Sequence, residues 1–215
     1  MHVGFVTYPR SGNSMMRKYF ENITGVVTGE EMGIKHSPHI SLQFSGLKGA
    51  DVYDSRTWIN KSHFPFTFPF SDVYTKDYII ISTRYELDTE VSFFYNVFTL
   101  THGLQFKNEL TKDPIWPYWK DFQTRAADAY NKWYSYWFKM AEESNIPIYF
   151  FRFEDVIHNP GKELKEIFRF ILGLKTIEGT VIEHRIDEVM SWSKEKNQSY
   201  KPRQGGTNKN LKNYT

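Results

Sequence analysis

The amino-acid sequence predicts a single-domain α/β fold in which a parallel β-sheet is flanked by helices on both faces. Three short apolar runs, at residues 3–7, 77–83 and 147–153, are typical of buried strands of a parallel sheet. Each run is followed by a segment in which apolar residues recur at helical spacing. Strands that alternate with helices favour a parallel sheet, because the crossover helices cover its faces. The sequence has no internal repeat and no linker, which predicts one domain, 1–215.

The first strand leads through a polar loop into a helix. The buried face of this helix is predicted from four apolar residues at i, i+3, i+4 and i+7, namely Met16, Tyr19, Phe20 and Ile23. Gly25 is expected to end it. Residues 29–56 contain several glycines and a proline and are expected to be irregular. A short strand is predicted at 57–61, before a proline-containing loop.

Helices also follow the later strands. The strand at 77–83 precedes a helix that Asp88 is expected to cap and whose apolar face comprises Val91, Phe94, Tyr95 and Phe98. A long aromatic-rich helix is predicted at 116–144. After the strand at 147–153, an Asn-Pro pair begins a helix with the buried stripe Leu164, Ile167, Phe168 and Ile171. A last helix is predicted at 179–194, and residues 196–215 form a polar, basic loop or tail.

Composition narrows the classes of function. The 27 basic and 25 acidic side chains give a formal net charge of +2, which argues against a general nucleic-acid binder. The absence of cysteine excludes disulfides, thiolate metal sites and cysteine nucleophiles, and without a carboxylate cluster we expect no metal. No run approaches the roughly 18 apolar residues of a transmembrane helix. The N-terminus lacks the pattern of a signal peptide, so we expect a cytoplasmic protein.

A glycine-containing loop, TYPRSGNSM at residues 7–15, lies between the first strand and the first helix. The N–H groups at a helix N-terminus bind anions, and Gly12 lets the backbone approach a ligand closely. Ser11 and Ser14 can donate hydroxyl hydrogen bonds, and Arg10 adds a fixed positive charge. The loop lacks the lysine and the spacing of a Walker A motif, which disfavours ATP or GTP hydrolysis. These residues alone support an anion site and an ordinary strand–helix turn equally.

Three further segments carry side chains suited to proton transfer or anion binding. In KSHFP, residues 61–65, His63 stands beside Lys61 near a strand end, where a histidine can accept a proton from a substrate hydroxyl. Arg84 directly follows the strongest strand, and Ser92 lies in the next helix, so the two could hold a phosphate. The tail segment YKPRQGG could fold over an anion. Taken singly, each segment is explained at least as well by solvated side chains.

Taken in order, these segments resemble the sulfotransferases that use 3′-phosphoadenosine 5′-phosphosulfate (PAPS). TYPRSGNSM resembles the phosphosulfate loop of that family, TYPKSGTTW, and KSHFP resembles its KTHxP segment. Arg84 and Ser92, with Asp88 between them, match its 3′-phosphate motif. RFEDVIHNPGKELKEIFRFI resembles YEDLxxDPxxEIxxIxxFL, and RQGGTNKNLKN is a weaker likeness of RKGxxGDWKN. The resemblance spans nearly the whole chain.

The resemblance implies PAPS as donor, adenosine 3′,5′-bisphosphate (PAP) as product, and roles for particular residues. His63 is implied as the general base, while Lys61 and Arg10 meet the charge on the departing phosphate. The tail, 196–215, is implied to cover the cofactor. The implied cofactor-binding residues are Arg10, Ser11, Gly12, Asn13, Ser14, Met15, Arg84, Ser92, Phe153, Arg203, Gln204 and Gly205.

Four of these positions depart from the family pattern. Arg10 replaces a lysine and, because a guanidinium is always protonated, it is a poor proton donor. Met15 replaces a tryptophan and Phe153 replaces a tyrosine, both at positions that the resemblance implies lie near the adenine. Gln204 replaces a lysine in the tail.

The sequence therefore predicts a PAPS-dependent sulfotransferase that acts on a hydroxyl, in preference to an amine, of a small-molecule acceptor. Residues 29–56 and 116–140 are expected to shape the acceptor pocket. Two alternatives stay open: a catalytically inactive nucleotide-binding protein on the same scaffold, and a P-loop kinase or NTPase. The sequence predicts neither the identity of the acceptor nor the oligomeric state.

Overall fold

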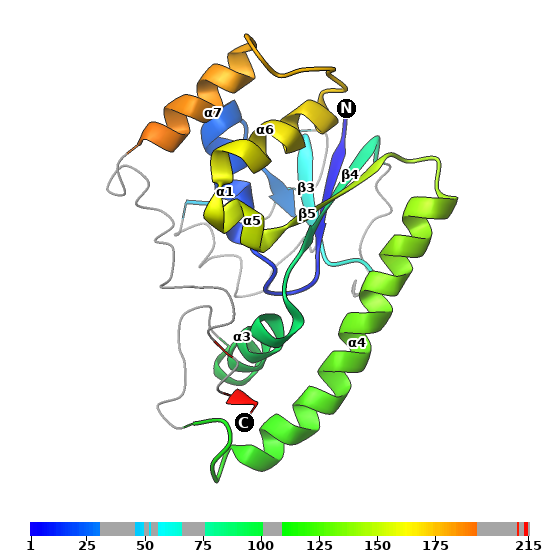
Figure 1. Ribbon diagram of the computed structural model, residues 1–215, viewed down its shortest axis with the longest axis vertical. Helices are drawn as coiled ribbons and strands as arrows, with labels where there is room; N and C mark the ends of the chain where they lie inside the picture. Colours follow the sequence, from blue (N-terminus) through cyan, green and yellow to red (C-terminus); the bar gives the residue numbers. More distant parts are fainter. Residues whose placement is uncertain are drawn as a thin grey trace.

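A five-stranded sheet forms the centre of the computed structural model, which describes residues 1–30, 46–49, 52, 56–65, 76–100, 109–192, 210 and 213–214. Its strands are β1 Val3–Thr7, β2 Gly29–Glu30, β3 Ile59–Ser62, β4 Tyr78–Thr83 and β5 Ile148–Arg152. They run in the order β2-β3-β1-β4-β5, and every neighbouring pair is parallel (Figure 1). The predicted fold class, a parallel sheet flanked by helices, is confirmed.

One face of the sheet is covered by α1 (Asn13–Thr24), α6 (Pro160–Ile171) and α7 (Val181–Ser191), with the short α5 (Phe153–His158) beside them (Figure 1). Phe5 of β1 points to this face and meets Phe20 of α1 edge to face, with 5.6 Å between the ring centroids. The predicted stripe of α6 is fully buried in the same cluster. Burial of this apolar surface is the main force that fixes α1, and hence the loop before it, on the sheet.

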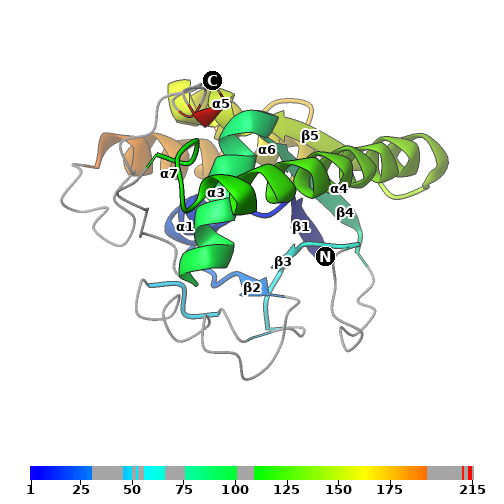
Figure 2. The same ribbon diagram turned by 90° about the horizontal axis from the view of Figure 1, so that it is seen from below.

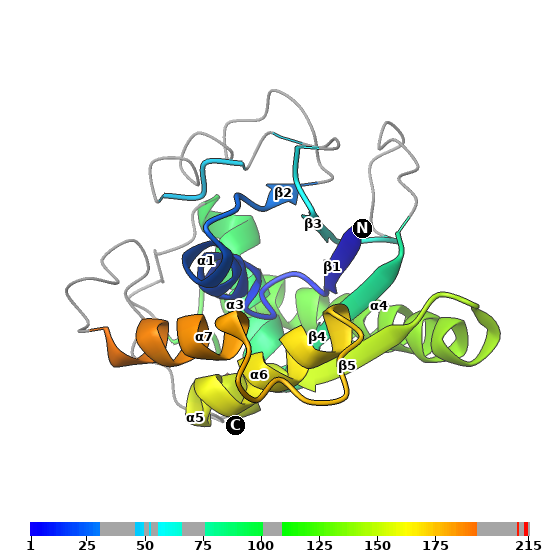
Figure 3. The ribbon, with the colours of Figure 1, turned by 90° about the horizontal axis from the view of Figure 1, so that it is seen from above.

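The long helix α4 (Trp116–Glu143) covers the opposite face, as the view from above shows (Figure 3). Its side chains Trp133, Tyr134 and Trp137 pack on Val6 and Ile81 of the sheet. These aromatic rings are buried, so this part of the predicted helix builds core and leaves little of its aromatic surface for an acceptor. Within the described ranges, none of the helices has the length and apolar content needed to cross a bilayer.

The helix α3 (Glu86–Thr99) lies beyond the carboxyl ends of the strands and packs against the first turns of α4 (Figures 1 and 2). Phe94 of α3 and Trp119 of α4 are both fully buried, with ring centroids 5.1 Å apart. The end of the chain joins this cluster, since Trp119 Nε1 donates to Asn213 O at 3.1 Å. This layer forms a wall next to the edge where the strands end.

Several local predictions were wrong in detail. β2 lies inside the segment expected to be irregular, because two residues are too few to produce a strand pattern. The apolar run of β5 continues into α5, so Phe153, expected in the strand, is the first residue of a helix. Tyr85, and not Asp88, is the residue before α3, and Asp88 is buried in its first turn, where it accepts from Asn210 N at 3.1 Å.

The strand order reverses at β1, because β2 and β3 lie on one side of it, and the chain then crosses to β4 and β5 on the other side. In open parallel sheets, ligands bind outside the carboxyl ends of the strands at such a switch point. Figure 2 looks onto this edge from below. The loops that follow β1, β3 and β4 therefore meet where a ligand site is expected.

Candidate functional site

The loop between β1 and α1 brings the N-terminus of a helix to the switch point. Ser11 N donates to Tyr8 O at 3.2 Å, which closes the turn, and Gly12 adopts a left-handed φ of 85°. α1 begins directly after Gly12, and within the described part of the chain no side-chain cap hydrogen bond forms at its N-terminus. Because the first N–H groups of a helix have no partner within it, this end of α1 is available to an anion.

A larger residue at position 12 is disfavoured both by the left-handed backbone and by lack of room for a side chain. A Cβ built on Gly12 would stand 2.3 Å from Cδ2 of Phe153, the first residue of α5. The Phe153 ring thus packs directly on the loop backbone and holds it against the end of β5. The sequence indicated that Gly12 allows close approach of a ligand, and the structure adds that it also allows close approach of Phe153.

Replacing Gly12 by alanine should therefore destabilise the protein beyond the cost of the backbone conformation alone. Gly25 is a matched control, because it too is left-handed, with φ 71°, yet a Cβ built on it has no atom of the described residues within 4 Å. We expect Gly12→Ala to lower the free energy of unfolding by about 1–3 kcal/mol more than Gly25→Ala. Urea denaturation of the two variants measures the difference, and equal losses would contradict the packing role of Phe153.

Arg10 connects the loop to two other elements. Its own φ is 72°, a left-handed conformation that costs a non-glycine residue about 1–2 kcal/mol. Its Nε donates to Ser92 Oγ of α3 at 2.9 Å, and its backbone O accepts from Arg84 Nη1 at 2.5 Å. These contacts hold the strained residue, and they bring together three predicted cofactor-binding residues that lie far apart in the sequence.

Arg84 occupies the end of β4 next to Phe153. Its guanidinium carbon lies 4.7 Å from the centroid of the Phe153 ring, a cation–π arrangement. The backbone O of Arg84 accepts from the Tyr130 hydroxyl of α4. Ser92, Arg84 and Phe153 therefore surround one corner of the site, beside the N-terminus of α1.

His63 lies just after β3, and its orientation is fixed by the end of β1. Its Nδ1 is 2.7 Å from Thr7 O, which can only accept, so Nδ1 carries the proton in the neutral ring. Thr7 Oγ1 lies 3.3 Å from the same nitrogen and accepts from Asn13 Nδ2 at 3.1 Å. Burial, and after it the charge of Lys61, lowers the pKa of His63 to about 3. The imidazole is therefore neutral at neutral pH, and Nε2 is the nitrogen that can accept a proton.

Lys61 is buried within β3, behind the strand end. Its Nζ donates to Glu30 Oε1 of β2, and Arg17 of α1 contacts the other oxygen of Glu30 at 3.2 Å. Neither Glu30 nor Arg17 was predicted from the sequence to belong to the site. Glu30 lies in the segment read as irregular, and Arg17 stands beside the apolar stripe of α1 with no local sign that it is buried.

The other predicted loop residues differ in their surroundings. Ser11 is fully buried, and its backbone O accepts from Ser82 Oγ at 2.8 Å. Its hydroxyl makes no well-formed hydrogen bond to the residues that the structure describes, although Tyr134 lies beside it. Ser14 lies half-buried in the first turn of α1. Met15 is buried in the core under α1. Arg203, Gln204 and Gly205 lie outside the described residues.

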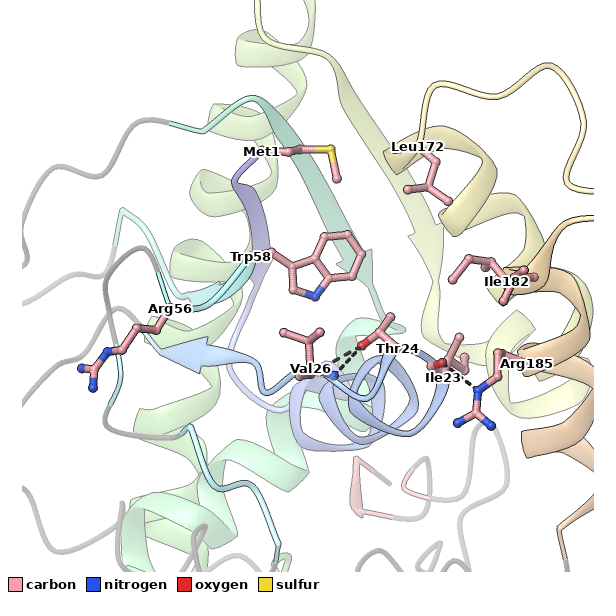
Figure 4. A pocket seen from close by; sticks show the side chains of 10 residues that line it. Met1, Ile23, Thr24, Val26, Arg56, Trp58, Leu172, Ile182 and Arg185 are labelled. Atoms are coloured by element: carbon pink, nitrogen blue, oxygen red, sulfur yellow. Dashed lines mark hydrogen bonds between the residues drawn. The ribbon is translucent and has the colours of Figure 1, made fainter.

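Two further observations delimit the site. A mostly apolar hollow of about 590 Å³ lies at the opposite edge of the sheet, where Met1 precedes β1 and Trp58 precedes β3 (Figure 4). Being at the amino ends of the strands, it is remote from the loops described above. No group of three or more potential metal ligands occurs in the part of the chain that the structure describes.

The comparisons with known proteins agree with this geometry. A search of curated protein sequences finds no match. A mouse sulfotransferase complexed with PAP has a similar fold, with a TM-score of 0.53 and 19% identity over 89% of this chain and 66% of its own. A retinol dehydratase in complex with androsterone and the inactive cofactor PAP is also similar in fold. Its TM-score is 0.52 and its sequence identity 16%, and the match covers 86% of this chain and 64% of the dehydratase chain.

The chain thus spans less than two thirds of the length of these two structures, and at this identity the likeness concerns the fold. The family assignment rests on the sequence model described as "Sulfotransferase domain", which matches residues 2–213. That range contains the glycine-containing loop of residues 7–15, His63, and the corner formed by Arg84 and Ser92. The chain therefore belongs to the sulfotransferase family.

Proposed function

We propose that this protein transfers a sulfuryl group from PAPS to a hydroxyl of a small-molecule acceptor, with His63 as the general base. One observation carries the proposal. Thr7, the residue that leads into the anion loop, also fixes His63 in the tautomer whose Nε2 can accept a proton. A base and an anion site at the ends of two neighbouring strands, β3 and β1, are the two parts that sulfuryl transfer to a hydroxyl requires.

The residues present fit a donor with two separate anionic groups. The uncapped N-terminus of α1 and the buried Ser11 hydroxyl suit the oxygens of a phosphosulfate. Arg84 and Ser92, at the neighbouring corner, suit a second phosphate. Phe153 would offer its ring beside that phosphate, where the family resemblance implies the adenine.

When bound, PAPS supplies a sulfuryl group, so that a bond from sulfur to the acceptor oxygen forms while the bond from sulfur to the bridging phosphate oxygen breaks. His63 Nε2 would accept the proton that the acceptor hydroxyl loses. The ammonium of Lys61 and the N–H groups of α1 would stabilise the negative charge that grows on the departing phosphate. Arg10 adds a permanent charge and, unlike a lysine, does not give up a proton at neutral pH.

A transfer assay with labelled PAPS and a panel of phenols, alcohols, amines and saccharides tests the proposal directly. Labelled product from at least one hydroxyl acceptor is the expected result. Thermal stabilisation by PAP without any transfer would support the inactive nucleotide-binding alternative instead. Magnesium-dependent release of phosphate from ATP would support the kinase or NTPase alternative.

Replacing Arg84 by alanine should weaken binding of PAP about 10- to 150-fold, which corresponds to the loss of a hydrogen bond to a charged group. Binding of AMP, which lacks the 3′-phosphate, should change much less. Isothermal titration of both ligands measures the two effects. Arg152→Ala is the matched control, since Arg152 is an exposed arginine at the end of the adjacent strand. Equal losses for PAP and AMP would remove Arg84 from the 3′-phosphate site.

A further inference from the structure

Three charged side chains are buried together between α1 and the sheet. Arg17, Glu30 and Lys61 are 1%, 2% and 9% exposed. Glu30 and Lys61 are register partners on β2 and β3, and Lys61 is also the partner of Phe5, whose ring packs under α1. The three charges therefore occupy the face of the sheet that α1 covers.

One carboxylate serves both cations. Glu30 Oε1 accepts from Lys61 Nζ, and Glu30 Oε2 lies 3.2 Å from Arg17 Nη1. Arg17 is locked in turn, because its Nε donates to Thr28 Oγ1 at 2.8 Å and its Nη2 donates to Thr28 O at 3.0 Å. The guanidinium of Arg17 thus holds the carboxylate of Glu30 in one position, and that carboxylate holds the ammonium of Lys61.

Burying these three charges adds little to the stability of the fold, so packing alone does not explain why they are present. Apolar side chains of similar volume often stabilise a core as well as a buried ion pair does, because the ions lose their hydration. Lys61 lies in β3, two residues before His63, which follows the strand, and its charge reaches the imidazole. An ammonium has three donors, and among the described residues only Glu30 accepts from Lys61. Two donors are left for another acceptor.

We propose that Glu30 is the positioning residue for Lys61, holding its ammonium in place beneath α1 while Arg17 holds Glu30. The role of Lys61 in catalysis rests on the function proposed above; the coupling of the three side chains does not. Two variants that should shift the titration midpoint of Lys61 in opposite directions test this coupling.

The charges that face Lys61 set the sign of the expected effects. Burial lowers the pKa of Lys61, Glu30 of β2 raises it, and Arg17 of α1 lowers it. His63 directly follows the strand of Lys61, and Glu21 faces Arg17 from within α1. Removing the charge of Glu30 should therefore shift the titration of Lys61 to lower pH, and removing the charge of Arg17 should shift it to higher pH.

The first measurement is the titration of Lys61 by NMR of lysine labelled at Cε, in the ligand-free protein, with Lys61→Met to assign the signal. We expect a midpoint about 1 to 3 pH units lower in Glu30→Gln than in the wild type. In Glu30→Asp, which keeps a carboxylate, the midpoint should lie close to the wild-type value. Arg17→Met, which keeps Glu30, should shift the midpoint upward, and it decides the question if Glu30→Gln does not fold. Unchanged midpoints in the folded variants would overturn the proposal.

The second measurement is the pH dependence of transfer with PAPS and an acceptor that the wild type uses. The alkaline limb of kcat/KM should move to lower pH in Glu30→Gln by the same interval as the NMR midpoint. A uniform loss at every pH would indicate a structural role only and overturn the proposal. Glu143→Gln, an exposed partner of Lys139 on α4, is the matched control and should leave the limb in place. A wild type without transfer activity would refute the proposed function, while the NMR titration would still decide the coupling.

Discussion

Replacement of His63 by alanine should lower the rate of sulfuryl transfer about 100- to 10,000-fold, the usual contribution of a general base. The physical reason is that Nε2 is the acceptor that the Thr7 contact leaves free, and alanine has none. Binding of PAP should stay near the wild-type value, because the described hydrogen bonds of the imidazole go to Thr7 at the end of β1 and not to the N-terminus of α1 or to Arg84. Single-turnover rates with labelled PAPS and isothermal titration of PAP measure the two quantities separately.

His184 provides the control for this substitution, since it is an exposed histidine on α7, on the outer side of the layer that covers the sheet. His184→Ala should transfer at the wild-type rate. The pH profile gives a further check, because with a pKa of about 3 the imidazole stays neutral down to mildly acidic pH. Protonation of His63 should therefore cause no loss of activity between about pH 8 and pH 5. Wild-type turnover in the purified His63→Ala protein would show that another group is the base.

Replacement of Lys61 by methionine should lower kcat about 100- to 1000-fold, the usual cost of losing one preorganised donor to a developing charge. Methionine keeps most of the volume of the buried side chain and removes the ammonium. Because Arg17 still pairs with Glu30 in this variant, it should unfold at a higher temperature than Glu30→Gln, in which two cations are left facing each other.

Comparison of kcat and melting temperature in these variants separates catalysis from stability. Lys132→Met is the matched control, since Lys132 pairs with Asp128 on the exposed side of α4. A kcat for Lys61→Met within a few-fold of the wild type would mean that Lys61 serves only the buried ion cluster. The departing phosphate would then be stabilised by the α1 N-terminus and Arg10 alone.

The fold was predictable where a strand or helix is long enough to repeat its own pattern. β1, β4 and β5 are continuous apolar runs, and α6 shows its buried stripe at regular helical spacing. β2 and α5 were missed because a strand of two residues and a helix that directly continues a strand leave no periodic signal. The prediction that Asp88 caps α3 was wrong because its carboxylate accepts from Asn210, which is 122 residues away in the sequence. No local pattern indicates such a contact.

The sequence by itself determined the parallel α/β architecture, and it predicted the glycine-containing loop after β1 as an anion site and His63, after β3, as the base. Those features depend on short segments in which residue type and spacing are sufficient, such as a glycine before a helix or a histidine after a strand. Only the tertiary structure decided that Arg10 bonds to Ser92, that Phe153 packs on Gly12, and that Arg17 and Lys61 share Glu30. These contacts join elements that are distant along the chain, and the sequence contains no local signal for which buried charges will meet. The energy of a buried charge depends on the partners that folding brings to it.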